Sequence, residues 1–229
     1  MTDQAPRPAA RWTKPLAVLA LVLIAVGAGA VYVMTTTPRN AGGIGTAAAN
    51  LAPCPSDPAR RARMAPKATG EVAAMLVDGH PRRLPALSFT DAAGKPVNLA
   101  DFRGKTVLFN MWATWCAPCR AEMPSLDKLQ AELGGKDFQV VAVSVDTNGK
   151  DKPKNFFASL GLKHLALHTD PSGEVFSTMR SIGRGIGLPT SLIVDPRGCE
   201  IGYMPGPADW ASPDAKALIE AALPEPGKG

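Results

Sequence analysis

The sequence predicts an α/β protein with a central mixed sheet flanked by helices and with an N-terminal transmembrane helix. Three observations predict this fold class. Segments typical of strands alternate with helical segments from about Leu87 to the C-terminus. Two strand segments, 107–109 and 140–143, are uninterrupted apolar runs, as expected for strands buried on both faces of a sheet. Residues 16–34 form an uncharged apolar stretch of roughly the length that crosses a membrane.

Composition sets the broad class of protein. The chain has 229 residues, 45% of them hydrophobic, which is enough for one domain and an appendage. The net charge is +5, but basic residues are dispersed among acidic ones, so we expect no nucleic-acid partner. Four cysteines are too few for a fold that depends on many disulfides, so each cysteine needs its own explanation.

The N-terminal segment predicts where the protein resides. Basic residues precede the apolar stretch 16–34, and no charge follows it until Arg39, so residues 1–15 are expected in the cytoplasm. This predicts a single-pass membrane protein with its domain outside the cytoplasm. A cleaved secretory signal ending near 28–30 is the alternative, although the apolar run is longer than a typical signal core. In both cases the domain lies in a compartment where disulfides persist.

After the membrane segment the chain divides into three parts. Residues 35–57 lack an apolar period and are rich in small residues, so they are predicted to be a tether. Residues 58–83 are predicted to be a helical extension, interrupted near Pro66 and Gly70. Residues 84–224 form the main domain.

The elements of the main domain are predicted from the hydrophobic pattern and from the turn residues that separate the segments. Short β-branched or apolar runs predict strands at 86–89, 106–112, 139–146, 165–169, 191–195 and 201–204. Longer mixed segments predict helices at 116–133, 152–160, 175–182 and 211–223. The turn 195–198 joins the last two strands without a helix between them, which predicts an antiparallel hairpin at one side of the sheet.

Cys116 and Cys119 stand two residues apart in the segment MWATWCAPCR. A structural zinc site needs four ligands, and His80, His164 and His168 do not have the required spacing, so no metal is expected. Redox chemistry fits better, because a cysteine at the start of the helix 116–133 meets the positive end of the helix dipole, which stabilises its thiolate. Cys116 is therefore the predicted nucleophile, Cys119 the resolving cysteine, and Cys116–Cys119 a redox-active disulfide that needs no cofactor.

The segments WATWCAPC and GLPTSLIVDPRG resemble the active site and the substrate-side loop of the thioredoxin-like family, over roughly residues 84–223. The resemblance implies a thioredoxin-like fold in which Pro124 kinks the active-site helix. It also implies that Pro189 is the cis-proline facing the cysteine pair, where the adjacent backbone pairs with an extended substrate. An ordinary turn proline is the alternative for Pro189. Four further residues are expected to contact the substrate: Trp115, Ala117, Pro118 and Leu188.

Within that family the chain is similar to the membrane-anchored TlpA and ResA branch, and to its TlpA proteins through GKPVNLADFRGKT, DPRGCEI and GPADWAS. Asn110 stands where cytoplasmic thioredoxins carry a buried Asp. Glu122 lies three residues after Cys119, on the same helix face, and matches an acidic residue of the ResA branch. We expect Glu122 to handle protons for the cysteine pair, with a solvated helix glutamate as the alternative.

Cys54 and Cys199 lack the helix-start environment that makes a thiol reactive. Since an exported protein seldom keeps two idle thiols, we predict a structural Cys54–Cys199 disulfide, and matching cysteines in TlpA proteins support it. Two free buried thiols are the alternative.

These features predict a monomeric, membrane-anchored thiol-disulfide oxidoreductase that reduces protein disulfides. The resemblance implies copper-binding cysteines in cytochrome oxidase assembly as substrates and a transmembrane protein as electron donor. Reduction of apocytochrome c is a second reading, disfavoured because no acidic residue occurs at 185–188, just before Pro189. A Cu(I) chaperone that uses both cysteines is a third, but it requires a histidine aimed at the pair.

Overall fold

The computed structural model describes residues 54–149 and 151–225, which belong to one compact unit. The predicted cytoplasmic segment 1–15, the membrane helix 16–34 and most of the tether 35–57 lie outside the described residues. Within residues 54–149 and 151–225, no helix has both the length and the apolar character needed to cross a membrane.

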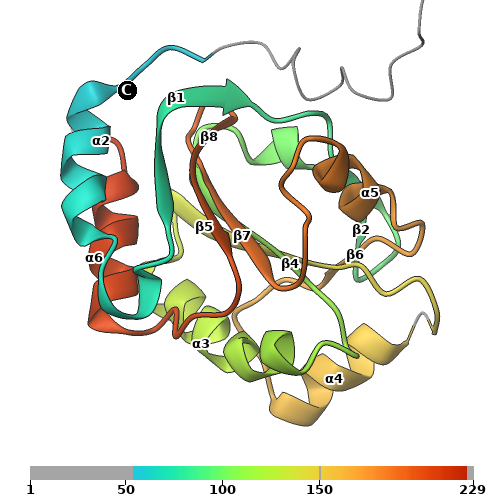
Figure 1. Cartoon of the computed structure of the whole chain (residues 1–229). Coiled ribbons are helices and arrows are strands. Elements are labelled where there is room, and N and C mark those ends of the chain that lie inside the picture. Colours follow the sequence, from blue (N-terminus) through green and yellow to red (C-terminus); the bar gives the residue numbers. More distant parts are fainter. Residues whose placement is uncertain (1–53, 150, 226–229) are drawn as a thin grey trace, which may run out of the picture. The chain divides into compact units, whose positions relative to one another are not determined.

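An eight-stranded mixed sheet forms the centre of the described unit, in the order β1-β8-β7-β4-β5-β6-β2-β3 (Figure 1). The strands are β1 (Leu76–Arg83), β2 (Ser88–Asp91), β3 (Pro96–Asn98), β4 (Thr106–Trp112), β5 (Phe138–Ser144), β6 (His168–Thr169), β7 (Thr190–Val194) and β8 (Cys199–Pro205). Strand β5 pairs in parallel with β4 and β6, whereas the other neighbours are antiparallel. The mixed sheet and the terminal hairpin β7–β8 agree with the predicted fold class.

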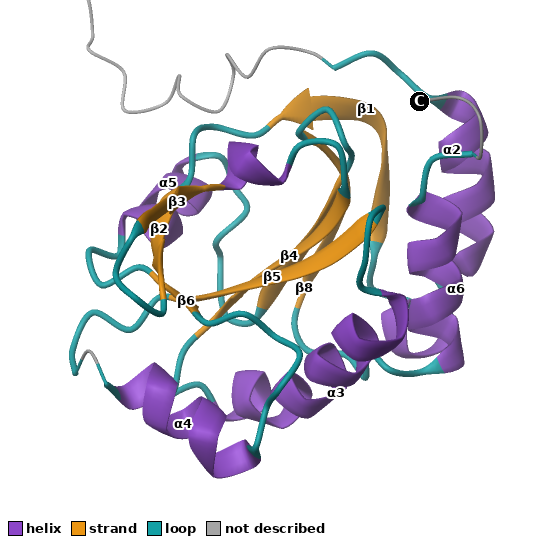
Figure 2. Ribbon diagram, turned by 180° about the vertical axis from the view of Figure 1, so that it is seen from behind, coloured by secondary structure: helices purple, strands orange, loops and turns teal. Residues whose placement is uncertain are grey.

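Helices cover both faces of this sheet (Figure 2). They are α2 (Pro58–Met64), α3 (Ala117–Leu133), α4 (Lys152–Leu160), α5 (Glu174–Ser181) and α6 (Pro213–Ala222). Short 3-10 turns lie at η2 (Ala65–Lys67), η3 (Gly70–Val72) and η4 (Leu99–Phe102). Helices α2 and α6 lie side by side next to the β1 edge.

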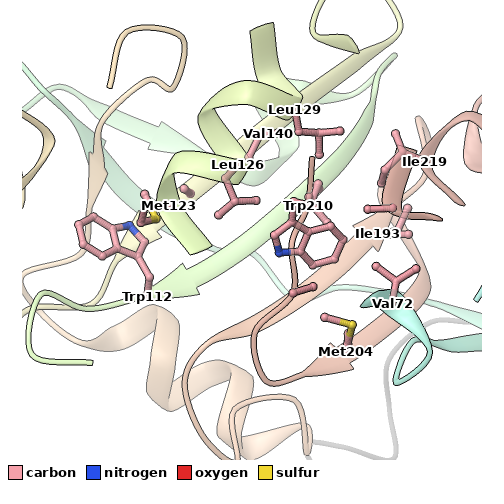
Figure 3. Close-up of a cluster of buried hydrophobic side chains, with 14 of the residues drawn as sticks. Val72, Trp112, Met123, Leu126, Leu129, Val140, Ile193, Met204, Trp210 and Ile219 are labelled. Atoms are coloured by element: carbon pink, nitrogen blue, oxygen red, sulfur yellow. The ribbon is translucent and has the colours of Figure 1, made fainter. Parts of the chain in front are cut away.

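Strand β4 is buried along its whole length, because each face of the sheet is covered by a different hydrophobic cluster. Leu108 and Trp112 face the cluster beneath α3 and α6, whereas Phe109 and Met111 face the cluster beneath α5. Figure 3 shows the first cluster, where side chains of α3 lie against those of β5, β7 and the loop before α6. This packing fixes α3 against β4, which positions the turn between them.

The predicted helical extension 58–83 is helical only in its first part. Helical structure ends with the 3-10 turn at Val72, and β1 (Leu76–Arg83) then forms the edge strand of the main sheet. The sequence does not indicate this strand, because Gly79 and Pro81 are residues that strands disfavour. A register shift between Val77 and Arg82 interrupts its pairing with β8 and accommodates them. The main sheet therefore begins before residue 84.

Candidate redox site

Cys116 and Cys119 lie at the start of α3 and are joined by a disulfide, with their Cα atoms 5.3 Å apart. Cys116 is the N-cap of α3, and its Sγ accepts a hydrogen bond from the Cys119 backbone N–H at 3.3 Å. The residue Cys116 is 6% exposed and Cys119 is fully buried. A thiolate at the Cys116 position would meet the helix dipole and an N–H donor, and an incoming sulfur reaches this cysteine more easily than Cys119.

The turn before Cys116 is held by Asp146, a residue that the sequence reasoning did not assign to the site. Its carboxylate accepts hydrogen bonds from the Thr114 backbone N–H at 2.9 Å, the Thr114 hydroxyl at 2.7 Å and the Ser144 hydroxyl at 2.7 Å. The sequence does indicate this position, because Asp146 lies two residues after the end of β5, a buried strand parallel to β4, and neighbouring parallel strands end at the same edge of a sheet.

Exposed apolar residues lie next to the two cysteines in the sequence, and two further apolar residues lie in the loop before β7. Trp115 is 70% exposed, and Ala117 and Pro118 on the first turn of α3 are exposed as well. In the loop before β7, Ile186 is 77% exposed and Leu188 is half-buried. The sequence analysis predicted all of these residues except Ile186. It could have been found as a large apolar residue between two glycines.

Trp112, unlike the exposed Trp115, has a packing role. It is fully buried, and its ring lies 5.3 Å from that of Phe156 and 5.7 Å from that of Phe157, between the centroids. Trp112 thus anchors the end of β4 on α4.

The Leu188–Pro189 peptide bond is cis and leads directly into β7. Thr190, the first residue of β7, pairs with Met111 near the end of β4, so Pro189 lies at the same edge of the sheet as the turn to Cys116. The Pro189 carbonyl accepts a hydrogen bond from the Gly206 N–H at 2.9 Å, and the Thr190 hydroxyl donates to the Gly187 carbonyl at 2.8 Å. These bonds hold the loop next to the cysteines.

Glu122 lies on α3 one turn after Cys119 and is only 3% exposed. Its Oε1 accepts from Asn110 Nδ2 at 2.8 Å, and its Oε2 accepts from the Ala208 N–H at 3.1 Å and the Trp210 indole N–H at 3.2 Å. Burial raises the pKa of Glu122 to about 7, and these three hydrogen bonds oppose the rise because they favour the ionised form. The alternative of a solvated helix glutamate is wrong.

Asn110 connects Glu122 to the sheet. Its side chain is buried on β4, and Nδ2 donates both to Glu122 and to the Ser191 hydroxyl at 3.0 Å. Asn110 carries no charge at any pH, so it holds the carboxyl without competing for its proton.

Glu122 also lines a hollow of about 490 Å³ that opens beside the active-site helix. The hollow is lined by Glu71, Pro118, Ala121, Glu122, Pro124, Ser125, Pro207, Ala208 and Asp209. The buried carboxyl thus lies next to an open hollow on the side of α3 that carries Pro118.

The histidines lie away from the pair. His168 pairs with Val143 on the face of the sheet opposite α3, and its buried ring contacts Phe89 and Phe102. His164 is exposed, and its backbone N–H donates to Asp127 in the second half of α3. Over residues 54–149 and 151–225, no three His, Cys, Asp or Glu side chains are grouped so that they could hold a metal ion.

Cys54 and Cys199 form a second disulfide, with their Cα atoms 6.1 Å apart. Cys199 begins β8, whereas Pro205 at the other end of β8 pairs with Thr190 beside the redox site. The Cys54 backbone N–H donates to the Pro81 carbonyl at 3.0 Å on the neighbouring strand. This disulfide therefore fastens the start of the described chain to the end of the sheet remote from Cys116.

Comparisons with known proteins agree with this geometry. The model of the Redoxin family matches residues 80–219. Thiol-disulfide oxidoreductase ResA of Bacillus thuringiensis subsp. konkukian is 35% identical over 117 residues, which is 51% of this chain and 64% of that protein. Thioredoxin-like protein YneN of Bacillus subtilis is 35% identical over 118 residues, 51% of this chain and 66% of that protein.

A solved structure shares the fold. The crystal structure of a thiol:disulfide interchange protein of the thioredoxin family from Chlorobium tepidum matches with a TM-score of 0.53 and 27% identity, covering 63% of this chain and 98% of that one. The match to the curated relatives is shorter, since the chain spans just under two thirds of the ResA protein's length.

Proposed function

The chain belongs to the redoxin family, and from this premise we propose that it is a thiol-disulfide oxidoreductase that reduces disulfides in other proteins. The observation that carries the proposal is the arrangement of Cys116 and Cys119 at the start of α3, with the first cysteine 6% exposed, the second fully buried and cis-Pro189 at the same edge of the sheet. ResA, which is 35% identical over the matched segment, is named for this activity.

The reaction begins with the reduced pair. The Cys116 thiolate attacks one sulfur of a substrate disulfide, which forms a mixed disulfide and releases one substrate thiolate. Cys119 then loses its proton and attacks the Cys116 sulfur, which releases the second substrate thiolate and forms Cys116–Cys119. Two electrons pass from the pair to the substrate, and the structure shows the resulting oxidised form.

Glu122 supplies the base for the second step. Cys119 is fully buried and must be deprotonated before it attacks, and Glu122 is the buried carboxyl one helical turn further along α3. A pKa of about 7 leaves this carboxyl ionised in a substantial fraction of molecules at neutral pH, as a general base requires. The hollow beside Pro118 then returns the proton to solvent.

We further propose that residues 16–34 anchor the protein in the inner membrane with the described domain in the periplasm, as in the TlpA proteins it resembles. Copper-binding cysteines of cytochrome oxidase assembly are the proposed substrates. A transmembrane protein must supply electrons, because an oxidising compartment would otherwise keep Cys116–Cys119 oxidised. The uncharged segment 185–188 before Pro189 favours this role over reduction of apocytochrome c.

A Cu(I) chaperone that binds copper through both cysteines is a weaker candidate function. A chaperone of this kind needs a histidine close to the two thiolates, and His168 lies on the opposite face of the sheet. We therefore place the pair in electron transfer to disulfides.

The test of the activity uses the full chain in detergent. The reduced protein is mixed with oxidised insulin, and disulfide reduction is followed by alkylation and mass spectrometry. We expect about one insulin disulfide reduced per chain for the wild type and none for Cys116→Ser. A wild-type protein that leaves insulin oxidised while dithiothreitol reduces it would contradict the proposal.

A deletion strain tests the physiological role. Loss of oxidase assembly with normal cytochrome c would support the copper-site role, and general loss of cytochrome c would contradict it.

A further inference from the structure

The loop between α5 and β7 carries exposed Ile186 and half-buried Leu188, yet little in its own sequence fixes its shape. Residues 182–189 include Gly183, Gly185 and Gly187, and glycine has the greatest backbone freedom of any residue. Ile186 at its tip is 77% exposed. The position of this tip must therefore be set by contacts made elsewhere in the loop.

Arg184 makes such a contact with the sheet. Its Nε donates to Glu200 Oε1 on β8 at 2.7 Å, and its guanidinium lies 4.7 Å above the ring of Tyr203, three residues after Glu200 on the same strand. The side chains of Arg184 and Glu200 are 17% and 3% exposed, so this is a nearly buried ion pair. A planar guanidinium that is hydrogen-bonded at its edge and stacked on its face has one preferred orientation.

The backbone around Arg184 is fixed as well. Its N–H donates to the Met179 carbonyl at 2.8 Å, which ties it to the last turns of α5. A Cβ atom at Gly185 would lie 2.9 Å from the Arg180 backbone nitrogen, so this residue is pressed against α5. Fixed points thus lie at residues 184–185 and at Gly187, whose carbonyl accepts a hydrogen bond from the Thr190 hydroxyl, and Ile186 lies exposed between them.

The pair has no part in the redox chemistry described above. Glu200 pairs with Val194 and Arg82, at the end of the sheet remote from Thr190 and the cysteines. Burial raises the pKa of Glu200, while Arg184 and, at longer range, Arg82 lower it, so the carboxylate depends on Arg184 to remain ionised in this position. A buried charge pair at this location requires an explanation other than catalysis.

We propose that Arg184 is a positioning residue for protein substrates: its bond to Glu200 and its stacking on Tyr203 fix the base of the loop, so that Ile186 and Leu188 are held beside Cys116. The inference rests on the proposed disulfide reductase activity and adds a determinant of substrate binding to it. Loss of the anchor lets the tip move and weakens recognition of a folded partner. Small thiols, which do not contact the loop, react as before.

The test compares a protein disulfide with a small one. Because Arg184→Met alone leaves Glu200 buried and unpaired, the main variant is the double substitution R184M/E200L, which removes both charges. Arg184→Lys is the second variant, since it keeps a cation opposite Glu200 but has no planar group to stack on Tyr203. Arg180→Met is the matched control, because Arg180 stacks on Phe176 beside the same loop but is exposed and has no link to β8.

The readouts are KM and kcat for insulin reduction by the full chain, and the rate at which dithiothreitol reduces Cys116–Cys119. We expect R184M/E200L to raise KM by about tenfold with kcat and the dithiothreitol rate within about twofold, R184K to raise KM less, and Arg180→Met to match the wild type. Wild-type KM in both R184M/E200L and R184K would overturn the inference. An inactive wild-type protein would instead overturn the proposed function.

Discussion

Replacing Glu122 by Gln tests whether the buried carboxyl titrates near neutral pH. Burial raises its pKa from 4.5 to about 7 in the folded protein. Between these pH values the folded state holds a proton that the unfolded chain releases. The contribution of Glu122 to the free energy of unfolding is therefore complete below about pH 4.5 and falls as the pH rises through about 7, by on the order of 3 kcal/mol.

The Gln variant lacks this pH dependence. Its amide oxygen can still accept from the Ala208 and Trp210 N–H groups, but its amide nitrogen then meets the Asn110 Nδ2 donor, so one of the three hydrogen bonds is lost. This mismatch costs about 1–3 kcal/mol at every pH. We expect Glu122→Gln to be less stable than the wild type at pH 4.5, and the deficit to shrink or reverse by pH 8 as the wild type loses its own contribution.

Urea unfolding of the oxidised full chain at pH 4.5, 6 and 8, followed by circular dichroism, measures this difference. Glu220→Gln is the control, because Glu220 is an exposed glutamate on α6 and its substitution should change stability little at any pH. A difference between wild type and Glu122→Gln that stays constant over the three pH values would refute the reasoning.

Three further predictions concern a hydrogen-bond donor to Glu122, the second disulfide and a buried histidine. Trp210→Phe removes the indole N–H that favours the ionised form of Glu122, so the pKa of Glu122 should rise and the pH profile of insulin reduction should move to higher pH; an unmoved profile would contradict this role. C54A/C199A opens a loop of sequence separation 145, which should lower the free energy of unfolding by up to about 5 kcal/mol in urea titrations while insulin reduction by the folded variant persists. Burial lowers the pKa of His168, so its contribution to stability is complete above about pH 6.5 and is lost as the pH falls toward its folded value; His168→Leu should flatten the decline of the melting temperature between pH 7 and 5, and an equal decline in both proteins would argue against this.

The central strands could be predicted from the sequence because their burial is recorded in continuous apolar runs. Strands β4 and β5 are buried on both faces, so most of their residues are apolar. The edge strand β1 has no continuous apolar run. It pairs on one side only, and its bulged segment contains Gly79 and Pro81. Strand β3 has three residues, too few to show a period.

The candidate site divides in the same way. The positions of Cys116, Cys119 and Pro189 follow from local sequence, because a helix start and an X-Pro bond are local features. The burial of Glu122 depends on Ala208 and Trp210, which lie more than eighty residues further along the chain. The local sequence around Glu122 therefore does not predict that the side chain is buried. The link from Arg184 to Glu200 likewise depends on how α5 lies over the sheet.

Trapping with Cys119→Ser tests the proposed reaction most directly. The reduced full-chain variant is mixed with oxidised insulin, the mixture is alkylated, and the adducts are mapped by mass spectrometry without reduction. We predict a mixed disulfide through Cys116 that dithiothreitol releases and that is absent from the double variant C116S/C119S. An adduct through Cys54 or Cys199, or no adduct from a folded variant, would contradict the assignment of Cys116 as the sulfur that attacks the substrate.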